Sequence, residues 1–264
     1  MTTGSIRIGI GGWTYDPWRS SFYPEKLAQK RELEYASRQL TSIEVNGTYY
    51  GNQKPESFQK WHDETPEDFV FSLKAPRYAT NRKVLADAGE TIERFLNSGV
   101  ILLGDKLGPI NWQFMATKKF DPGDFEAFLK LLPPSHEGRA LRHVVEVRHD
   151  SFRVPEFIEL IRAHHVAAVV SADGGFPQIA DPTADFVYVR LMGTTEDERL
   201  GYSAGTLDLW AQRVRSWAAG GAPEGLEYIG NAARSGSRDV YLYVIGGHKV
   251  RNPHAAVALI ERLG

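Results

Sequence analysis

The chain of 264 residues contains no cysteine. This absence excludes disulfide bonds, thiolate nucleophiles, cysteine-ligated iron–sulfur clusters and zinc sites built on cysteine. The chain also lacks any run of about 18 apolar residues, which is the length that a membrane-spanning helix needs. Its first residues have no apolar core of the kind found in signal peptides, so we expect a cytoplasmic protein with no membrane partner.

The chain has no large excess of charge of either sign. Its 31 Lys and Arg face 33 Asp and Glu, which gives a formal net charge of -2. No global basic field therefore attracts the protein to nucleic acid or to an anionic membrane. Apolar residues make up 42% and charged residues 24%, as in an ordinary folded protein.

Common nucleotide-binding and metal-binding motifs are missing. Gly9, Gly11 and Gly12 lack the GxGxxG spacing, and no Walker A, HExxH or HxH pattern occurs. The sequence leaves the cofactor and the oligomeric state open.

The chain does contain a repeated alternation of short apolar runs and helix-like segments. With 264 residues, eight units would take about 33 residues each, an ordinary βαβ spacing. This pattern predicts an α/β fold, a single (β/α)₈ TIM-type barrel spanning residues 1–264, with a doubly wound open sheet as the alternative. The predicted strands are 6–10, 41–45, 69–73, 110–114, 143–147, 166–172, 186–191 and 240–245. The predicted helices are 25–40, 55–62, 91–97, 125–132, one opening at Pro155, 207–219 and 253–263.

Alternation along these strands separates two faces. Successive side chains of a strand point to opposite sides. One parity is apolar and suits the layer under the helices. The other is polar near the carboxyl ends of the strands, where barrel active sites lie. This inward set comprises Glu44, Asn46, Ser72, Lys74, Asn111, Gln113, Glu146, Arg148, Ser171, Asp173 and Arg190.

The inward set predicts a charge-balanced site with three acids and three bases. Burying six charges adds little stability, because desolvation offsets the attraction, so a functional site is favoured over a structural plug. We expect Arg148, Arg190 and Lys74 to bind a carboxylate or phosphate. The predicted catalytic acid–base residues are Glu44, Lys74, Glu146 and Asp173. The predicted substrate-binding residues are Trp13, Asn46, Tyr49, Gln113, Arg148, His149 and Arg190.

Two other interpretations stay open. The aromatic first loop, which includes Trp13, Trp18 and Tyr23, could stack a base in a non-catalytic nucleotide or nucleic-acid binder. Packing of these rings on the barrel rim is favoured.

A metal-dependent hydrolase is the second alternative. Glu44, Glu146, Asp173, His149 and His248 are ligand types, although three nearby cations argue against a metal. Lys74 as a Schiff-base lysine is less favoured than Lys74 in a salt bridge.

Several motifs in order resemble the domain-of-unknown-function 72 family, also called YecE-like. The matching residues are 9–15, Trp18, 22–24, 44–50, 74–78, 107–113, 146–149, Asp173 and 188–193. The resemblance covers essentially the whole chain and implies a TIM-type barrel but no particular activity. The chain departs from the family pattern at Met115-Ala116, where a Pro-Pro pair is usual, and at Gly246-Gly247, where an Asn-Asn pair is usual.

Overall fold

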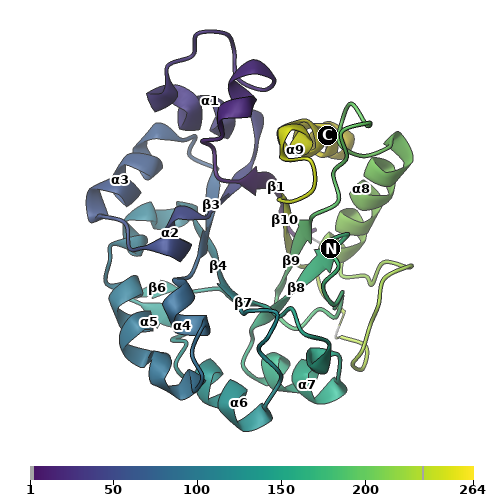
Figure 1. Cartoon of the computed structure of the whole chain (residues 1–264). Helices are drawn as coiled ribbons and strands as arrows, with labels where there is room; N and C mark the ends of the chain where they lie inside the picture. The colour runs from purple at the N-terminus through teal and green to yellow at the C-terminus, as the bar shows by residue number, and fades with distance from the viewer. Residues whose placement is uncertain (1–2, 234) are drawn as a thin grey trace.

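The computed structural model describes residues 3–233 and 235–264. Eight parallel strands close into a barrel in the order β1-β10-β9-β8-β7-β4-β3-β2 (Figure 1). The bounds are β1 (Ile6–Gly11), β2 (Ser42–Val45), β3 (Val70–Lys74), β4 (Leu107–Gln113), β7 (His143–Glu146), β8 (Ala167–Ala172), β9 (Phe186–Leu191) and β10 (Asp239–Val244). Because β1 pairs with both β2 and β10, the predicted barrel is confirmed and the open-sheet alternative is wrong.

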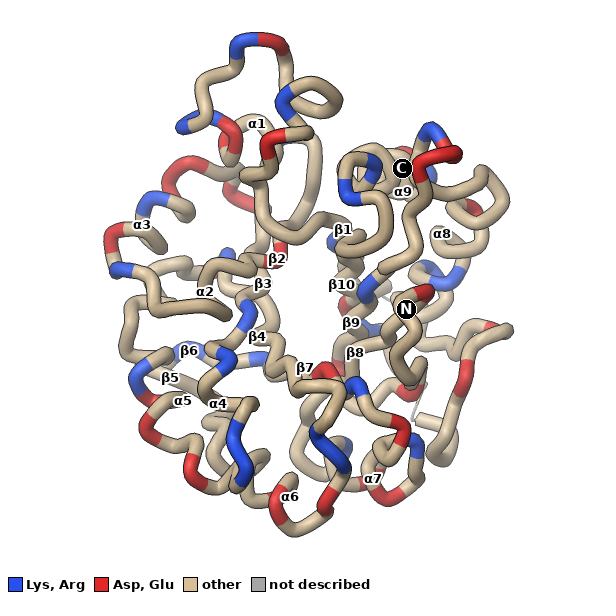
Figure 2. The backbone as a smooth tube through the Cα atoms, in the orientation of Figure 1, with Lys and Arg blue, Asp and Glu red and all other residues tan. Residues whose placement is uncertain are grey.

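Helices surround the strands on the outside of this ring (Figure 1). Their bounds are α1 (Glu32–Gln39), α2 (Gly47–Tyr50), α3 (Pro55–Glu64), α4 (Arg77–Thr80), α5 (Gly89–Leu96), α6 (Pro122–Lys130), α7 (Pro155–Ala163), α8 (Ala204–Ala218) and α9 (Asn252–Leu263). Proline opens α3, α6 and α7, a position where its missing N–H costs nothing. Most Lys, Arg, Asp and Glu lie on these helices and on the loops, and a few lie on the strands (Figure 2).

The structure differs from one predicted helix and, at another point, from the predicted alternation of strands and helices. The helix expected over 25–40 begins only at Glu32, because Lys26 has a φ of 63° and 29–31 form a 3₁₀ turn. The alternation of strand and helix also breaks after β8. Within the described residues the segment 173–185 joins β8 to β9 without a helix, since Gly174, Gly175 and two prolines interrupt it.

The sequence did not predict the one-turn helices α2 and α4. It also did not predict a short hairpin of β5 (Ser135–His136) and β6 (Arg139–Ala140). Across residues 3–233 and 235–264, no helix has the length and apolar character needed to cross a membrane.

The strands separate two apolar cores, as their alternation predicts. Phe71, Trp112 and Val145 point outward into the layer beneath the helices. The inner core fills the amino-terminal part of the barrel and comprises Val144, Ala167, Val169, Phe186, Tyr188, Tyr241 and Tyr243. Burial on both faces explains why strand residues are almost entirely inaccessible.

Strand β1 contributes glycine to the barrel interior. A Cβ on Gly9 would lie 1.9 Å from the carbonyl oxygen of Ser42, and one on Gly11 would lie 2.8 Å from Nδ2 of Asn46. Only glycine therefore allows β1 to approach β2 this closely. The interior beside β1 is left to large side chains from the other strands.

Candidate active site at the carboxyl ends of the strands

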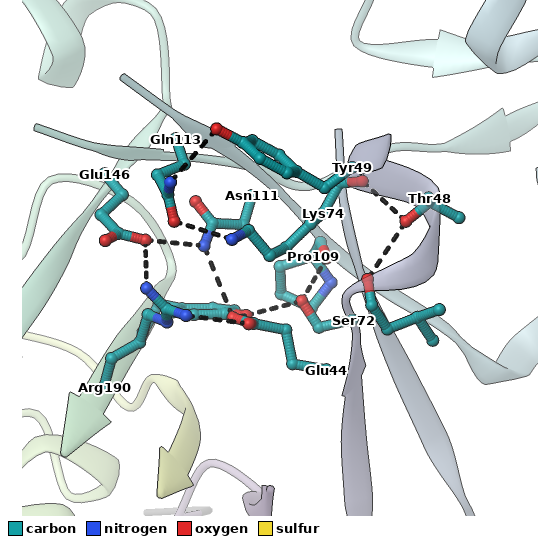
Figure 3. Close-up of polar contacts among 12 residues, drawn as sticks. Glu44, Thr48, Tyr49, Ser72, Lys74, Pro109, Asn111, Gln113, Glu146 and Arg190 are labelled. Carbon is teal, nitrogen blue, oxygen red and sulfur yellow. Dashed lines mark hydrogen bonds and ion pairs between the residues drawn. The ribbon is translucent and has the colours of Figure 1, made fainter. Parts of the chain in front are cut away.

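Arg190 on β9 joins two fully buried carboxylates. Its Nη1 donates to Oε2 of Glu146 at 2.5 Å, and its Nη2 donates to Oε1 of Glu44 at 3.1 Å. Asn111 Nδ2 lies between the same carboxylates and donates to Glu146 at 3.2 Å and to Glu44 at 3.5 Å (Figure 3). Four strands, β2, β4, β7 and β9, are thereby connected across the barrel interior.

The ion pairs keep this part of the site charged. Burial by itself would raise the pKa of Glu146, but Arg190 and Arg148 outweigh that effect and hold its pKa below the usual value. Burial by itself would lower the pKa of Arg190, but Glu146 and Glu44 raise it above the usual range. A carboxylate held in this way is a poor proton donor near neutral pH.

Lys74 and Arg148 converge on Gln113. Lys74 Nζ donates to Oε1 of Gln113 at 2.7 Å, and Arg148 Nη2 donates to the same oxygen at 2.9 Å. Arg148 is also paired with Glu146, at 2.6 Å. Lys74 forms no ion pair with any carboxylate of the described chain, and its Nζ lies 4.3 Å from the centre of the Tyr49 ring (Figure 3).

Burial gives Lys74 an unusual acidity. Its side chain is buried, and the loss of hydration lowers its pKa to about 8, although the nearby Glu44 acts in the opposite direction. Among the charged residues of the site, Lys74 therefore has a pKa suited to proton exchange at neutral pH.

Several buried polar atoms of the site have no hydrogen-bond partner among the described residues. They are Asn111 Oδ1, Ser171 Oγ and Arg190 Nε. Ser171 and Arg190 are neighbours in the β8–β9 register. Each such atom costs about 1–3 kcal/mol unless water or a ligand satisfies it, so these atoms provide unused capacity to bind a polar molecule.

Two aromatic residues that were absent from the predicted site take part in it. Tyr188 donates to Oε2 of Glu44 at 2.7 Å and lies 2.8 Å from Oγ of Ser72. It stands two residues before Arg190, so the same alternation could have identified it. Phe176 lies 4.3 Å from the Arg148 guanidinium, but it belongs to the irregular segment after β8, where no periodicity applies.

Asp173 does not join the charged cluster. The residue is exposed, and its carboxylate accepts a hydrogen bond from the Tyr202 hydroxyl at 3.3 Å. Strand β8 ends at Ala172 and Asp173 has a φ of 61°, so the alternation that points Ser171 inward no longer applies. The expected balance of three acids and three bases is therefore wrong, because among the described residues Glu44 and Glu146 are the carboxylates that face the three cations.

Three predicted substrate-binding residues make their contacts outside the charged cluster. His149 Nδ1 accepts the backbone N–H of Ser151 at 3.1 Å and so caps the turn after β7. Asn46 packs across Gly11 at the start of α2. Trp13 packs edge-on against Trp61, with ring centres 5.3 Å apart.

Most of the first loop is committed to packing. Trp18 is buried and its indole N–H donates to the carbonyl oxygen of Lys249 at 2.9 Å, and Tyr23 is also buried. The ligand types considered for a metal are not gathered together. In the part of the chain that the structure describes, no group of three or more His, Asp or Glu side chains could hold an ion.

The chain is similar in sequence to known proteins. A family model described as "Protein of unknown function DUF72" matches residues 7–264. The UPF0759 protein YecE of Escherichia coli (strain K12) is 30% identical over 150 residues, which are 56% of this chain and 50% of YecE. The UPF0759 protein YunF of Bacillus subtilis (strain 168) is 36% identical over 70 residues, 26% of this chain and 24% of YunF. The matched part thus spans half or less of the length of these curated relatives.

Solved structures share the barrel. A DUF72 family protein from Thermotoga maritima has a TM-score of 0.74 at 23% identity, covering 98% of this chain and 99% of that one. One from Enterococcus faecalis has a TM-score of 0.72 at 15% identity, covering 100% and 99%. A xylose isomerase-like TIM barrel fusion protein has a TM-score of 0.50 at 13% identity, covering 96% of this chain and 41% of that one. These similarities show a TIM-barrel fold, and the resemblance predicted from the motifs is confirmed.

Proposed function

The chain belongs to the DUF72 family of proteins of unknown function, and we propose from its site that it is an enzyme for acid–base chemistry on a small metabolite bearing a carboxylate or a phosphate. The site lies at the carboxyl ends of the barrel strands, the end at which barrel enzymes bind their substrates.

The surplus of positive charge carries this proposal. Glu44 and Glu146 together balance two of the three cations of the site, and Lys74 and Arg148 both donate to one neutral oxygen of Gln113. Two cations held at one neutral acceptor repel each other, so a bound anion would lower the free energy of the arrangement.

Exposure distinguishes the roles of the two arginines. The Arg148 side chain is 22% exposed, whereas that of Arg190 is 3% exposed and both its Nη atoms are used by carboxylates. Arg148 and Lys74 are therefore the groups that would meet the substrate anion. Arg190 acts through Glu44 and Glu146 as a positioning residue.

Lys74 is the group best suited to exchange a proton with substrate. Its pKa of about 8 lies close to neutral pH, whereas the pKa of Glu146 is held low by two arginines. Glu44 and Glu146 would fix the cations rather than carry the proton. The proposed role of these two carboxylates therefore differs from the acid–base role expected from the sequence.

A ligand screen by thermal shift tests the proposal. The wild type, Arg148→Met and the control Arg153→Met would be heated with phosphorylated and carboxylated metabolites, nucleotides and divalent metals. Arg153 is a fair control because it pairs with Glu227 at the surface. A ligand at about 100 times its Kd adds about 2.7 kcal/mol of stability, and each kcal/mol raises the midpoint by roughly 2–4 °C.

We expect a stabilising anion whose effect disappears in Arg148→Met and persists in Arg153→Met. Equal stabilisation of both variants, or no response to any small anion, would contradict the proposal. A response to a divalent metal alone would favour the hydrolase alternative.

A non-catalytic nucleotide binder is the second candidate, supported by exposed rings outside the first loop. Tyr50 is 67% exposed and Tyr78 is 58% exposed. The guanidinium of Arg77 lies 5.9 Å from the first ring and 5.2 Å from the second. Such a pair of rings could stack a base beside the anion site. Nucleotide binding that is lost in Tyr50→Ala and Tyr78→Ala, with no turnover, would favour this candidate.

A further inference from the structure

Lys74 is held differently from Lys106, which is buried to the same degree. Lys106 Nζ has three acceptors, the carbonyl oxygens of His62 and Thr65 and the hydroxyl of Thr65. An ammonium group has three N–H donors, so Lys106 is fully satisfied as a cation. Lys74 Nζ has one oxygen acceptor in the described chain, Oε1 of Gln113, and otherwise faces the Tyr49 ring.

The surroundings of Lys74 make its neutral amine form accessible near neutral pH. The carboxylates nearest to the site are engaged by Arg190 and Arg148, and Arg148 also competes for the Gln113 oxygen. Loss of hydration destabilises the ammonium form, and the pKa of about 8 agrees with this geometry. A buried lysine beside another cation is the arrangement that turns an amine into a nucleophile toward carbonyl carbon.

We propose that Lys74 forms an imine with a small aldehyde or ketone whose carboxylate or phosphate is held by Arg148. The inference rests on the proposed function, because the anion site positions the carbonyl group. It adds a substrate class, carbonyl compounds carrying an anionic group, and a covalent role for one residue.

The step is balanced without any oxidant or reductant. The lone pair of Nζ forms the new C–N bond, and the carbonyl oxygen leaves as water with the two hydrogens that the nitrogen gives up. Oε1 of Gln113 accepts an N–H of Lys74 and so directs the lone pair away from itself. Uptake of a proton from solvent by the imine nitrogen gives the cationic form, which the π face of the Tyr49 ring would stabilise.

Borohydride trapping tests the proposal on the intact protein. Wild type, Lys74→Arg and the matched control Lys106→Arg would be incubated with pyruvate or with dihydroxyacetone phosphate and then reduced with sodium borohydride. Intact mass and peptide mapping would locate the adduct. We expect one reduced adduct on Lys74 in the wild type and in Lys106→Arg, and its loss in Lys74→Arg.

Anions without a ketone or aldehyde group distinguish a failure of the imine proposal from a failure of the proposed anion site. Lactate and glycerol 3-phosphate match the two probes but form no imine, and their binding would be measured by calorimetry on the same variants. Binding of either anion without an adduct from either probe would overturn the imine and leave the proposed function standing. Adducts spread equally over many lysines would also overturn it. Absence of both anion binding and adduct would contradict the proposed function and the imine together.

Discussion

Lys74 and Arg148 donate hydrogen bonds to one shared atom, Oε1 of Gln113, at 2.7 and 2.9 Å. The two side chains come from β3 and from the end of β7, and their meeting point is on β4 between them. A neutral amide therefore holds two cations where a carboxylate would normally stand. This relationship gives the site its unbalanced positive charge.

Replacing that amide by a carboxylate should stabilise the protein and block the site. Gln113→Glu keeps the shape of the side chain and gives Lys74 and Arg148 a charged acceptor, and a hydrogen bond to a charged group is worth about 1 kcal/mol more than one to a neutral group. We expect a higher melting temperature, a Lys74 pKa above about 8, and weaker binding of any anion. Thermal melts would measure the change in melting temperature, and calorimetry would measure the change in anion binding. Gln212→Glu on the exposed face of α8 is the control, and equal behaviour of the two variants would contradict the prediction.

Removing the charge of Glu146 should destabilise the fold strongly. Glu146→Gln leaves Arg190 and Arg148 without their shared carboxylate in a buried place. Breaking one partner of a buried pair typically costs about 3–5 kcal/mol. Glu227→Gln removes a surface partner of Arg153, for which we expect about 0–1 kcal/mol. Urea denaturation of both variants would give the difference, and a similar cost for both would show that the buried pairs contribute little.

His143 should make stability depend on pH. It is buried on β7, accepts the indole N–H of Trp112 at 3.1 Å and contacts the carbonyl oxygen of Pro133 at 2.8 Å. Burial lowers its pKa from 6.5 to about 4. The unfolded chain therefore binds a proton at a higher pH than the folded protein does. The stabilisation is complete above pH 6.5 and is lost as the pH falls through about 4, by about 3 kcal/mol in all.

His143→Gln removes this titration while keeping one acceptor for Trp112 and one donor for Pro133. We expect the free energy of unfolding of the variant to change less than that of the wild type between pH 6.5 and 4. Denaturation curves at several pH values would measure the slope. The control is His165→Asn, an exposed position with a φ of 55° that asparagine tolerates. An unchanged slope in His143→Gln would rule out this histidine as the cause.

The first loop should contribute to stability rather than to binding. Trp13 packs against Trp61 and Phe71, so Trp13→Leu should lower the free energy of unfolding by about 1–3 kcal/mol and leave anion binding unchanged. Tyr50→Ala should change stability by less than about 0.5 kcal/mol, because its side chain is exposed. Melting curves and calorimetry on both variants would check this. Loss of ligand binding in Trp13→Leu at full stability would instead return the first loop to the binding site.

Local pattern was sufficient to predict the eight strands and the two faces of each strand. Alternation depends only on neighbouring residues, so Glu44, Lys74, Glu146 and Arg190 could be assigned to the interior without knowing what surrounds them. The same rule failed at Asp173, where a backbone with a φ of 61° ends the alternation one residue after β8. It also gave no information about Phe176, which follows in the irregular segment.

The sequence by itself determined that this protein alternates eight strands with helical segments and carries charged side chains at the carboxyl ends of the strands, because hydrophobic period and strand spacing are local properties. Only the tertiary structure decided the partners of those charges. Closure of β1 onto β10 and the register of β9 bring Arg190 between Glu44 and Glu146, from strands far apart in the chain. That arrangement pairs both carboxylates with arginine and leaves Lys74 beside a neutral amide. Residue order alone could not specify this pairing, because contacts across a barrel depend on the stagger and tilt of its strands.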